Sequence, residues 1–233
     1  MASSAEPLAG RTALVTGGSR GIGRAAAAAL IGAGARTTIV ARDANALART
    51  ARELGARAHA GDVADAEMVQ ALAATPVDIV VHAAGAFALA PIEHTSVEAF
   101  DRQIAVNLRA AFLLMRAFVP AMRASGRGHF VSIGSIAGRQ PFSSNGAYAA
   151  SKFGLRGLHA VLDAELRGTG VRATLVEPAA TDTALWEAVD RGANPGLPGA
   201  AEMLDPAAVA AAVLYAVTQP AAVAVRNVIL ERA

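Results

Sequence analysis

The chain has 233 residues, 54% of them hydrophobic and 17% charged, which excludes a disordered chain and allows a sizeable core. The formal net charge is only +2, and no block of like charges occurs, which argues against nucleic acid as a partner. Cysteine is absent and the five histidines lack ligand spacing, so we expect neither disulfides nor a metal. Residues 1–9 resemble no signal peptide, and we read every apolar run as too short, or too often broken by Gly and charge, to span a bilayer. We therefore expect no membrane, a cytoplasmic protein and a loose N-terminal arm over residues 1–9.

Short β-branched apolar runs alternate along the chain with longer, Ala-rich helical patterns. The expected strands are Thr12–Thr16, Thr37–Val40, Arg57–Ala60 (the weakest), Val77–Val81, His129–Ile133, Arg172–Val176 and Val225–Leu230. The expected helices are Ile22–Gly34, Ala44–Leu54, Ala66–Ala73, Val97–Ser125, Ala147–Arg167 and Ala207–Thr218. Such alternation predicts a parallel sheet with helices on both faces. The fold class is therefore α/β, a single doubly wound Rossmann-type domain over residues 1–233 with about seven strands.

The least regular stretch of the sequence is residues 180–204, which is rich in Gly and Pro. Segments of this composition at the end of a strand often cover a binding site, so we expect this stretch to cover the substrate. Asp205 and Pro206 follow it and are typical of a helix N-cap with Pro at the first helical position.

A glycine-rich turn joins the first strand to the first helix. Glycines let the backbone approach a pyrophosphate closely, and the helix start offers unpaired N–H groups to the phosphates. The spacing is Gly-x3-Gly-x-Gly, not the commoner Gly-x-Gly-x2-Gly, and a tight turn without a ligand is the alternative. The residues expected to contact a dinucleotide are Gly17, Ser19, Arg20, Gly21, Ile22 and Gly23.

The end of the second strand bears on the choice of dinucleotide. An acidic residue there would bind the ribose hydroxyls of NAD, whereas an arginine suits the 2′-phosphate of NADP. Ala41 stands at the expected strand end, Arg42 follows it, and Arg20 adds a second cation, so the sequence favours NADP(H) over NAD(H). If the strand ends one residue later, Asp43 reads the ribose instead.

Tyr148 and Lys152 lie one helical turn apart, so both side chains project from one helix face. Lys152 is the single lysine among 21 basic residues. A nearby ammonium lowers the pKa of a phenol, which makes proton exchange with an alcohol or carbonyl oxygen feasible. Ser135 follows a strand at the edge where such sheets bind ligands, and its hydroxyl can hold the substrate oxygen. A turn serine, a half-buried tyrosine and a surface lysine are the alternative interpretation.

These motifs together resemble those of the short-chain dehydrogenase/reductase family over nearly the whole chain. The glycine turn matches that family's cofactor turn, and further cofactor contacts are implied for Asp62, Val63, Ala84, Gly85, Tyr148, Lys152, Pro178, Thr181 and Thr183. The residues at the positions of its catalytic tetrad are Asn107, Ser135, Tyr148 and Lys152. The resemblance also implies a homotetramer, with a dimer as the alternative.

The resemblance implies a role for each tetrad residue. Tyr148 would be the acid in carbonyl reduction and the base in alcohol oxidation. Lys152 would lower its pKa and hold the nicotinamide ribose, Ser135 would orient the carbonyl, and Asn107 would hold a relay water. Two positions depart from the family pattern, His82 before Ala-Ala-Gly and Ala179 after Pro178.

The sequence is less informative about the substrate. Apolar residues after the motifs favour a small to medium, mostly apolar carbonyl or alcohol, although each of them could equally belong to the core: Phe87, Leu89, Gln140, Phe142 and Trp186. One alternative is a 3-oxoacyl-(acyl carrier protein) reductase, which the C-terminal sequence disfavours. A second is a non-catalytic NADP-binding sensor, which would keep the glycine turn but tend to lose the Tyr–Lys pair.

Overall fold

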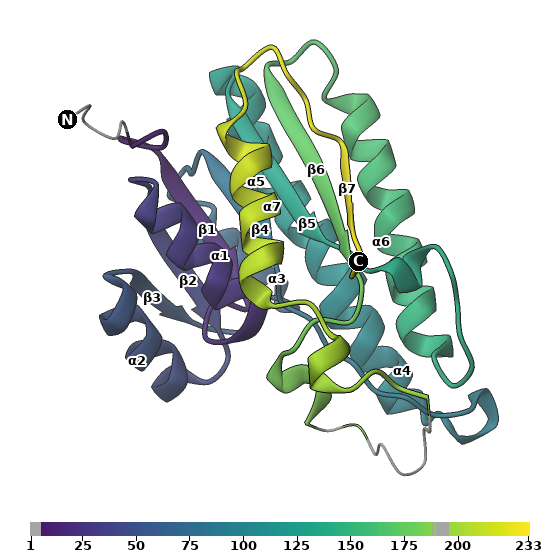
Figure 1. The fold of residues 1–233 in the computed structure, drawn as a ribbon. Helices are drawn as coiled ribbons and strands as arrows, with labels where there is room; N and C mark the ends of the chain where they lie inside the picture. The colour runs from purple at the N-terminus through teal and green to yellow at the C-terminus, as the bar shows by residue number, and fades with distance from the viewer. Residues whose placement is uncertain (1–5, 188, 190–195) are drawn as a thin grey trace.

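In a computed structural model, which describes residues 6–187, 189 and 196–233, one parallel sheet forms the centre of the molecule (Figure 1). Its strand order is β3-β2-β1-β4-β5-β6-β7. The strands are β1 (Thr12–Thr16), β2 (Arg36–Ala41), β3 (Arg57–Ala60), β4 (Ile79–His82), β5 (Gly128–Ile133), β6 (Val171–Pro178) and β7 (Asn227–Leu230). The order reverses between β1 and β4, and ligands bind in such sheets at this switch point. The predicted fold class is confirmed.

Helices cover both faces of the sheet. They are α1 (Gly21–Gly32), α2 (Ala44–Leu54), α3 (Ala66–Leu72), α4 (Val97–Ile104), α5 (Ala110–Ser125), α6 (Gly146–Glu165) and α7 (Pro206–Thr218). Short turns of helix are η1 (Ile92–His94), η2 (Ala105–Arg109), η3 (Ile136–Gly138), η4 (Ala184–Trp186) and η5 (Ala200–Glu202). The side chain of Asp205 caps α7 by accepting a 2.7 Å hydrogen bond from the Ala207 amide, as the sequence predicted.

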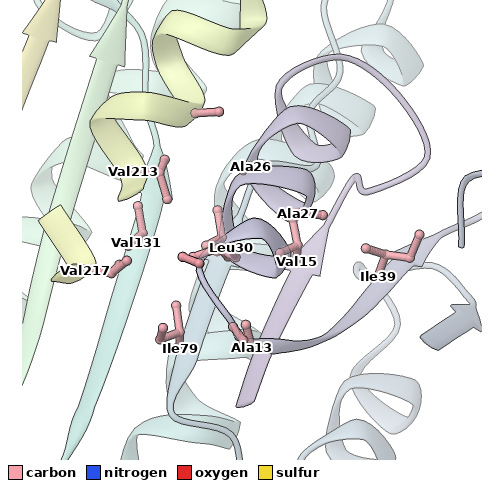
Figure 2. Packing of buried hydrophobic residues seen from close by; sticks show 14 of the residues in the cluster. Ala13, Val15, Ala26, Ala27, Leu30, Ile39, Ile79, Val131, Val213 and Val217 are labelled. Atoms are coloured by element: carbon pink, nitrogen blue, oxygen red, sulfur yellow. The ribbon is translucent and has the colours of Figure 1, made fainter. Parts of the chain in front are cut away.

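Two apolar cores lie on opposite faces of the sheet. On one face α1 and α7 run beside each other, and Leu30 and Val213 pack on Val15 and Val131 of the strands (Figures 1 and 2). On the other face α5 and α6 pack on the sheet through a second cluster that includes Phe130. Small side chains on α1, such as Ala26, bring the helix close to the strands, which fixes the glycine turn at its start.

The stretch expected as one helix over Val97–Ser125 contains a π-turn, η2, between α4 and α5. By length and composition this stretch is long and apolar enough to cross a membrane, contrary to our interpretation of the sequence. In the fold, however, its α5 part packs on the sheet, where side chains such as Leu114 belong to the second core.

The N-terminal arm is packed in its described part. The expectation of a loose segment is wrong for residues 6–9, because Leu8 is buried and its amide donates a 2.8 Å hydrogen bond to the Ala33 carbonyl. Residues 1–5 lie outside the described part of the chain, as do 188 and 190–195 of the expected covering stretch. The rest of that stretch contains η4, η5 and a bridge between Thr181 and Leu204.

Candidate active site

Two adjoining cavities open at the carboxyl edge of the sheet. The first, of about 610 Å³, extends from the glycine turn to the ends of β2 and β3, and the second, of about 380 Å³, lies over β5, β6 and the start of α6. The residues that line both are Ile22, Ala83, Ala84, Gly85, Thr183 and Leu185. A ligand that fills the first cavity therefore ends beside the second.

Close backbone packing explains the glycines of the turn. A Cβ on Gly23 would lie 2.3 Å from the Gly17 carbonyl oxygen, and one on Gly17 would lie 2.8 Å from that of Ala83. Gly17 also has a φ of +68°, which favours glycine. The turn is thus held tight against β4, and it presents the amino end of α1 to the first cavity.

The structure decides which residue occupies the end of β2. The strand ends at Ala41, as expected, and the Asp43 carboxylate accepts a 2.9 Å hydrogen bond from the Ala46 amide as the N-cap of α2. Arg20 and Arg42 both line the first cavity, and neither forms an ion pair with a described residue. Two exposed cations therefore stand beside the end of β2 in the first cavity.

His82 replaces the usual asparagine of the fourth-strand motif without breaking the turn that follows. Its Nδ1 atom lies 3.0 Å from the Thr16 hydroxyl oxygen, which also accepts a 3.2 Å hydrogen bond from the Ala84 amide. Burial, followed by the positive charge of Lys152, lowers the pKa of His82 to about 3, so the imidazole is neutral. One side-chain network thus joins β1, β4 and the Ala84 turn.

Tyr148, Lys152 and Ser135 line the second cavity together. The Lys152 ammonium donates a 2.9 Å hydrogen bond to the Ile133 carbonyl, and its Nζ atom lies 5.5 Å from the centroid of the Tyr148 ring. The Ser135 hydroxyl accepts a 3.1 Å hydrogen bond from the Ala137 amide and also hydrogen-bonds to the Tyr148 phenol. The alternative of a surface lysine is excluded, since Lys152 is only 6% exposed.

Burial dominates the proton affinities of this pair. It raises the pKa of Tyr148 to about 12, opposed by the hydrogen bond from Ser135, and it lowers the pKa of Lys152 to about 8. The net pKa of Tyr148 thus lies above its ordinary value in the protein alone, because desolvation of the phenol is the largest effect. A phenol with this pKa is protonated at neutral pH and suits the role of an acid.

Asn107 lies in the π-turn and is fully buried, so the interpretation of an exposed polar position is excluded. Its side-chain oxygen accepts a 2.8 Å hydrogen bond from the Ala86 amide, and its Nδ2 atom donates to the Ala86 carbonyl at 2.9 Å and to the Ser151 hydroxyl at 2.9 Å. Ser151 in turn donates to the Tyr148 carbonyl at 2.7 Å. Asn107 lines neither cavity and ties the Gly85 loop to α6.

The segment after β6 returns to the glycine turn. The Thr181 hydroxyl donates a 3.0 Å hydrogen bond to the Ala179 carbonyl, and the Thr183 side chain packs against Gly21, where a Cβ would lie 3.1 Å away. The Ala179 amide donates a 2.8 Å hydrogen bond to the Leu230 carbonyl of β7. The segment is therefore held by β7 on one side and by the glycine turn on the other, and it lies where the two cavities adjoin.

Aromatic side chains form one wall of the second cavity. The Phe87 ring lies edge-on to Tyr148 at 4.7 Å between centroids and to Trp186 at 5.0 Å, and the Trp186 indole donates a 3.0 Å hydrogen bond to the Thr181 carbonyl. Phe142 also lines this cavity, as expected, but Leu89 and Gln140 do not.

Most of the residues expected at the site meet there. Those in the first cavity are Gly17, Ser19, Arg20, Gly21, Ile22, Gly23, Arg42, Asp62, Val63, Ala84, Gly85 and Thr183. Those in the second include Ser135, Tyr148, Lys152, Pro178 and Thr181. Sequence reasoning missed Gly61 and Leu185, although each directly adjoins or closely follows a motif residue. Leu197 and Pro198, which belong to the stretch expected to cover the substrate, line the second cavity.

A doubly wound parallel sheet with a glycine turn at its switch point, beside a Ser-Tyr-Lys cavity, defines a dinucleotide-dependent class of oxidoreductases. The model of the short chain dehydrogenase family matches residues 11–194. The chain therefore belongs to the short-chain dehydrogenase/reductase family.

Three comparisons illustrate the relationship. D-threitol dehydrogenase of Mycolicibacterium smegmatis is 39% identical over 189 residues, which cover 76% of this chain and 73% of that protein. Glycine betaine reductase ATRR of Emericella nidulans is 37% identical over 97% of this chain, but the match spans only 19% of that longer protein. A metagenomic short-chain oxidoreductase in complex with NADP superposes with a TM-score of 0.82 at 34% identity, covering 97% of this chain and 99% of that one.

Proposed function

We propose that the chain reduces a carbonyl to an alcohol, and catalyses the reverse oxidation, with NADP(H). The observation that carries this proposal is the joint presence of Ser135, Tyr148 and Lys152 in a cavity that adjoins the glycine-turn cavity. Tyr148 and Lys152 also argue against a non-catalytic sensor, because a protein that only bound the cofactor would not need a phenol and an ammonium beside the substrate space.

The residues of the first cavity fit NADP(H). The tight glycine turn and the amino end of α1 suit a pyrophosphate, and Arg20 and Arg42 suit a 2′-phosphate. Asp62 and Val63 would border the adenine, and Pro178, Thr181 and Thr183 the nicotinamide amide. The cofactor, when bound, supplies or accepts the hydride. One solved relative in complex with NADP and another in complex with 5-hydroxy-NADP support this assignment.

The side chains of the second cavity would handle the proton. Ser135 donates to the carbonyl oxygen and orients it, while the Tyr148 phenol passes its proton to the same oxygen as negative charge develops there. A developing alkoxide is a far stronger base than a phenolate, so the raised pKa of Tyr148 does not prevent this transfer. Lys152 stabilises the resulting phenolate and would hold the nicotinamide ribose, and Asn107 would keep a water in a proton relay behind Lys152.

The second cavity favours a small to medium, mostly apolar substrate. Phe87, Phe142 and Trp186 contribute aromatic surface, and Lys152 is the one charged side chain among its described lining residues. Among these described lining residues, a carboxylate or phosphate on the substrate would find no arginine. The proposal therefore names neutral ketones and aldehydes ahead of charged acids.

Oxidation of NADPH, followed by its absorbance, with a panel of neutral ketones, aldehydes and 3-oxoacyl thioesters would test this proposal. We expect turnover with apolar ketones or aldehydes. Turnover with 3-oxoacyl thioesters alone would support the acyl-carrier-protein reductase instead. Tight NADPH binding without turnover on any carbonyl would leave the sensor as the function.

We further propose that the chain forms a homotetramer, with a dimer as the alternative. Large apolar side chains lie exposed on the helices of one face, with Phe112 of α5 48% exposed and Phe153 of α6 42% exposed. Self-association about a two-fold axis would cover them. Light scattering that gives the mass of a monomer at micromolar concentration would overturn this. The single domain over residues 1–233 and the cytoplasmic location stay predictions.

A further inference from the structure

A buried carboxylate lies directly behind the second cavity. Glu177 is the penultimate residue of β6, just before Pro178, and is 1% exposed. Its Oε2 atom accepts a 2.7 Å hydrogen bond from Nε of Arg139 and forms an ion pair with Nη2 of the same guanidinium at 2.6 Å, and its Oε1 atom lies 3.7 Å from Nε of Arg156. None of these three residues has a part in the mechanism above.

The two arginines belong to the two segments that carry the reacting groups. Arg139 directly follows η3, the short turn that Ser135 caps at its other end. Arg156 lies on α6, one helical turn after Lys152 and two after Tyr148. Glu177 therefore connects the end of β6 to the Ser135 turn and to the helix of the acid–base pair.

The Ser135 turn is also confined by close contacts at its two glycines, Gly134 and Gly138. A Cβ on Gly138 would lie 2.9 Å from the Lys152 carbonyl oxygen, and one on Gly134 would lie 3.1 Å from Cγ of Glu177. The Ser135 turn is thus packed between the Glu177 side chain and the backbone of α6. Its far end is secured by the charge-assisted pair of Arg139 with Glu177.

We propose that Glu177 is a positioning residue that, through Arg139, holds the Ser135 turn so that the serine hydroxyl meets the Tyr148 phenol and the substrate oxygen. This inference rests on the proposed carbonyl reduction. A displacement of the hydroxyl by a fraction of an ångström weakens its bond in the transition state far more than it weakens cofactor binding.

The chain offers a matched control at the opposite edge of the sheet. Asp78 is also a carboxylate shared by two arginines, with Arg11 at 3.1 Å and Arg127 at 2.7 Å. It lines neither cavity. Glu177→Gln and Asp78→Asn therefore remove the same kind of charge, one beside the Ser135 turn and one far from it.

The test measures kcat, KM, the Kd for NADPH and the melting temperature of E177Q and D78N. We expect both variants to lose thermal stability, but only E177Q to lose kcat, by about tenfold or more, with the Kd for NADPH within about twofold of the wild type. Arg139→Gln, at a partly exposed position, should repeat the loss of kcat and serves as the measurement if E177Q does not fold. Equal losses of kcat in E177Q and D78N, or full turnover in E177Q or R139Q, would overturn the proposal.

A double-mutant cycle separates positioning from a general loss of structure. If Glu177 acts through Ser135, E177Q should slow single-turnover NADPH oxidation by less than about twofold in a Ser135→Ala background. An undiminished loss in that background would contradict the proposal. A wild-type protein without turnover would instead count against the proposed function itself, which keeps the two failures apart.

Discussion

The ammonium of Lys152 lies 5.5 Å from the centroid of the Tyr148 ring. One helical turn separates the two residues on α6, and Lys152 is fixed at its far end by the Ile133 carbonyl of β5. The helix and the strand together therefore set the position of the charge beside the phenol. Neither side chain needs to move to reach the second cavity, which both already line.

Tyr148→Phe should abolish turnover and leave NADPH binding nearly unchanged. The change removes the hydroxyl that gives up the proton but keeps the ring that packs on Phe87. Steady-state kinetics and NADPH binding by fluorescence measure the two effects separately. Tyr215 is the other tyrosine, is 58% exposed and lies on α7, so Tyr215→Phe is the matched control and should keep full activity. Substantial turnover in Y148F would refute the assigned role.

Carbonyl reduction should weaken as the pH rises above about 8. Burial lowers the pKa of Lys152 to about 8, so its ammonium is charged below that pH and becomes neutral above it. The loss of the positive charge removes the stabilisation of the Tyr148 phenolate, and kcat/KM should fall up to tenfold per pH unit. A profile that stays flat to pH 9.5 would contradict this.

Lys152→Arg should also lose most of its kcat for carbonyl reduction although the charge is kept, because the planar guanidinium does not fit the site of the compact ammonium.

The protein should prefer NADPH to NADH by about a hundredfold or more. Charge-assisted hydrogen bonds are worth roughly 1.5–3 kcal/mol each, and Arg20 and Arg42 can each give one to the 2′-phosphate. The measurement is the ratio of kcat/KM for the two cofactors with one carbonyl substrate. Replacing Ala41 by Asp together with Arg42→Ser should reverse the preference, since a carboxylate at the strand end accepts the ribose hydroxyls and repels the phosphate.

Asp43→Ser is the control for this experiment. Serine can still cap α2, so the variant should fold normally and keep the preference for NADPH. A wild-type preference for NADH that D43S abolished would show that Asp43 reads the ribose, contrary to its role as a cap.

Stability should fall steeply with acid below about pH 6.5, chiefly because of three buried histidines. Burial lowers the pKa of His82 and of His129 to about 3 and that of His159 to about 4. Each unfolded imidazole takes up a proton near pH 6.5 that its folded form refuses, so the stability present above this pH is lost as the pH falls towards these values. Three such groups give a slope of about 4 kcal/mol per pH unit near pH 5.

Urea unfolding at a series of pH values checks this slope. His82→Asn removes one imidazole but keeps a hydrogen-bonding partner for the Thr16 hydroxyl, and it should reduce the slope by about a third. A free energy of unfolding that is constant from pH 7 to 5 would contradict the prediction.

The sequence pattern predicted the bounds of those helices and strands that depend on neighbouring residues alone. Helix α2 and strands β1 and β3 have the predicted bounds, since caps and apolar runs are encoded within a few residues. The π-turn was missed because its residues continue the helical pattern without interruption. Within this turn Asn107 hydrogen-bonds to Ala86, which lies 21 residues earlier in the chain, and a contact of that range is not visible in a local pattern.

The same distinction applies to the site. The motifs predicted most of the residues that meet at the site, but burial, which depends on the whole fold, determines the proton affinities of Tyr148 and Lys152. The connection from Glu177 to Arg139 spans 38 residues and could not be read from either motif.

The two cavities share a boundary, which should fix the order in which dinucleotide and substrate bind. Ile22, Gly85 and Thr183 line both cavities, so a dinucleotide bound in the first cavity would form part of the wall of the second. A substrate that enters before the dinucleotide lacks that part of its binding surface. We therefore expect a compulsory sequence in which the dinucleotide enters first and leaves last. Release of the oxidised dinucleotide, more than the chemical step, would then limit the rate with the best substrates. A dead-end substrate analogue should compete with the carbonyl but not with NADPH.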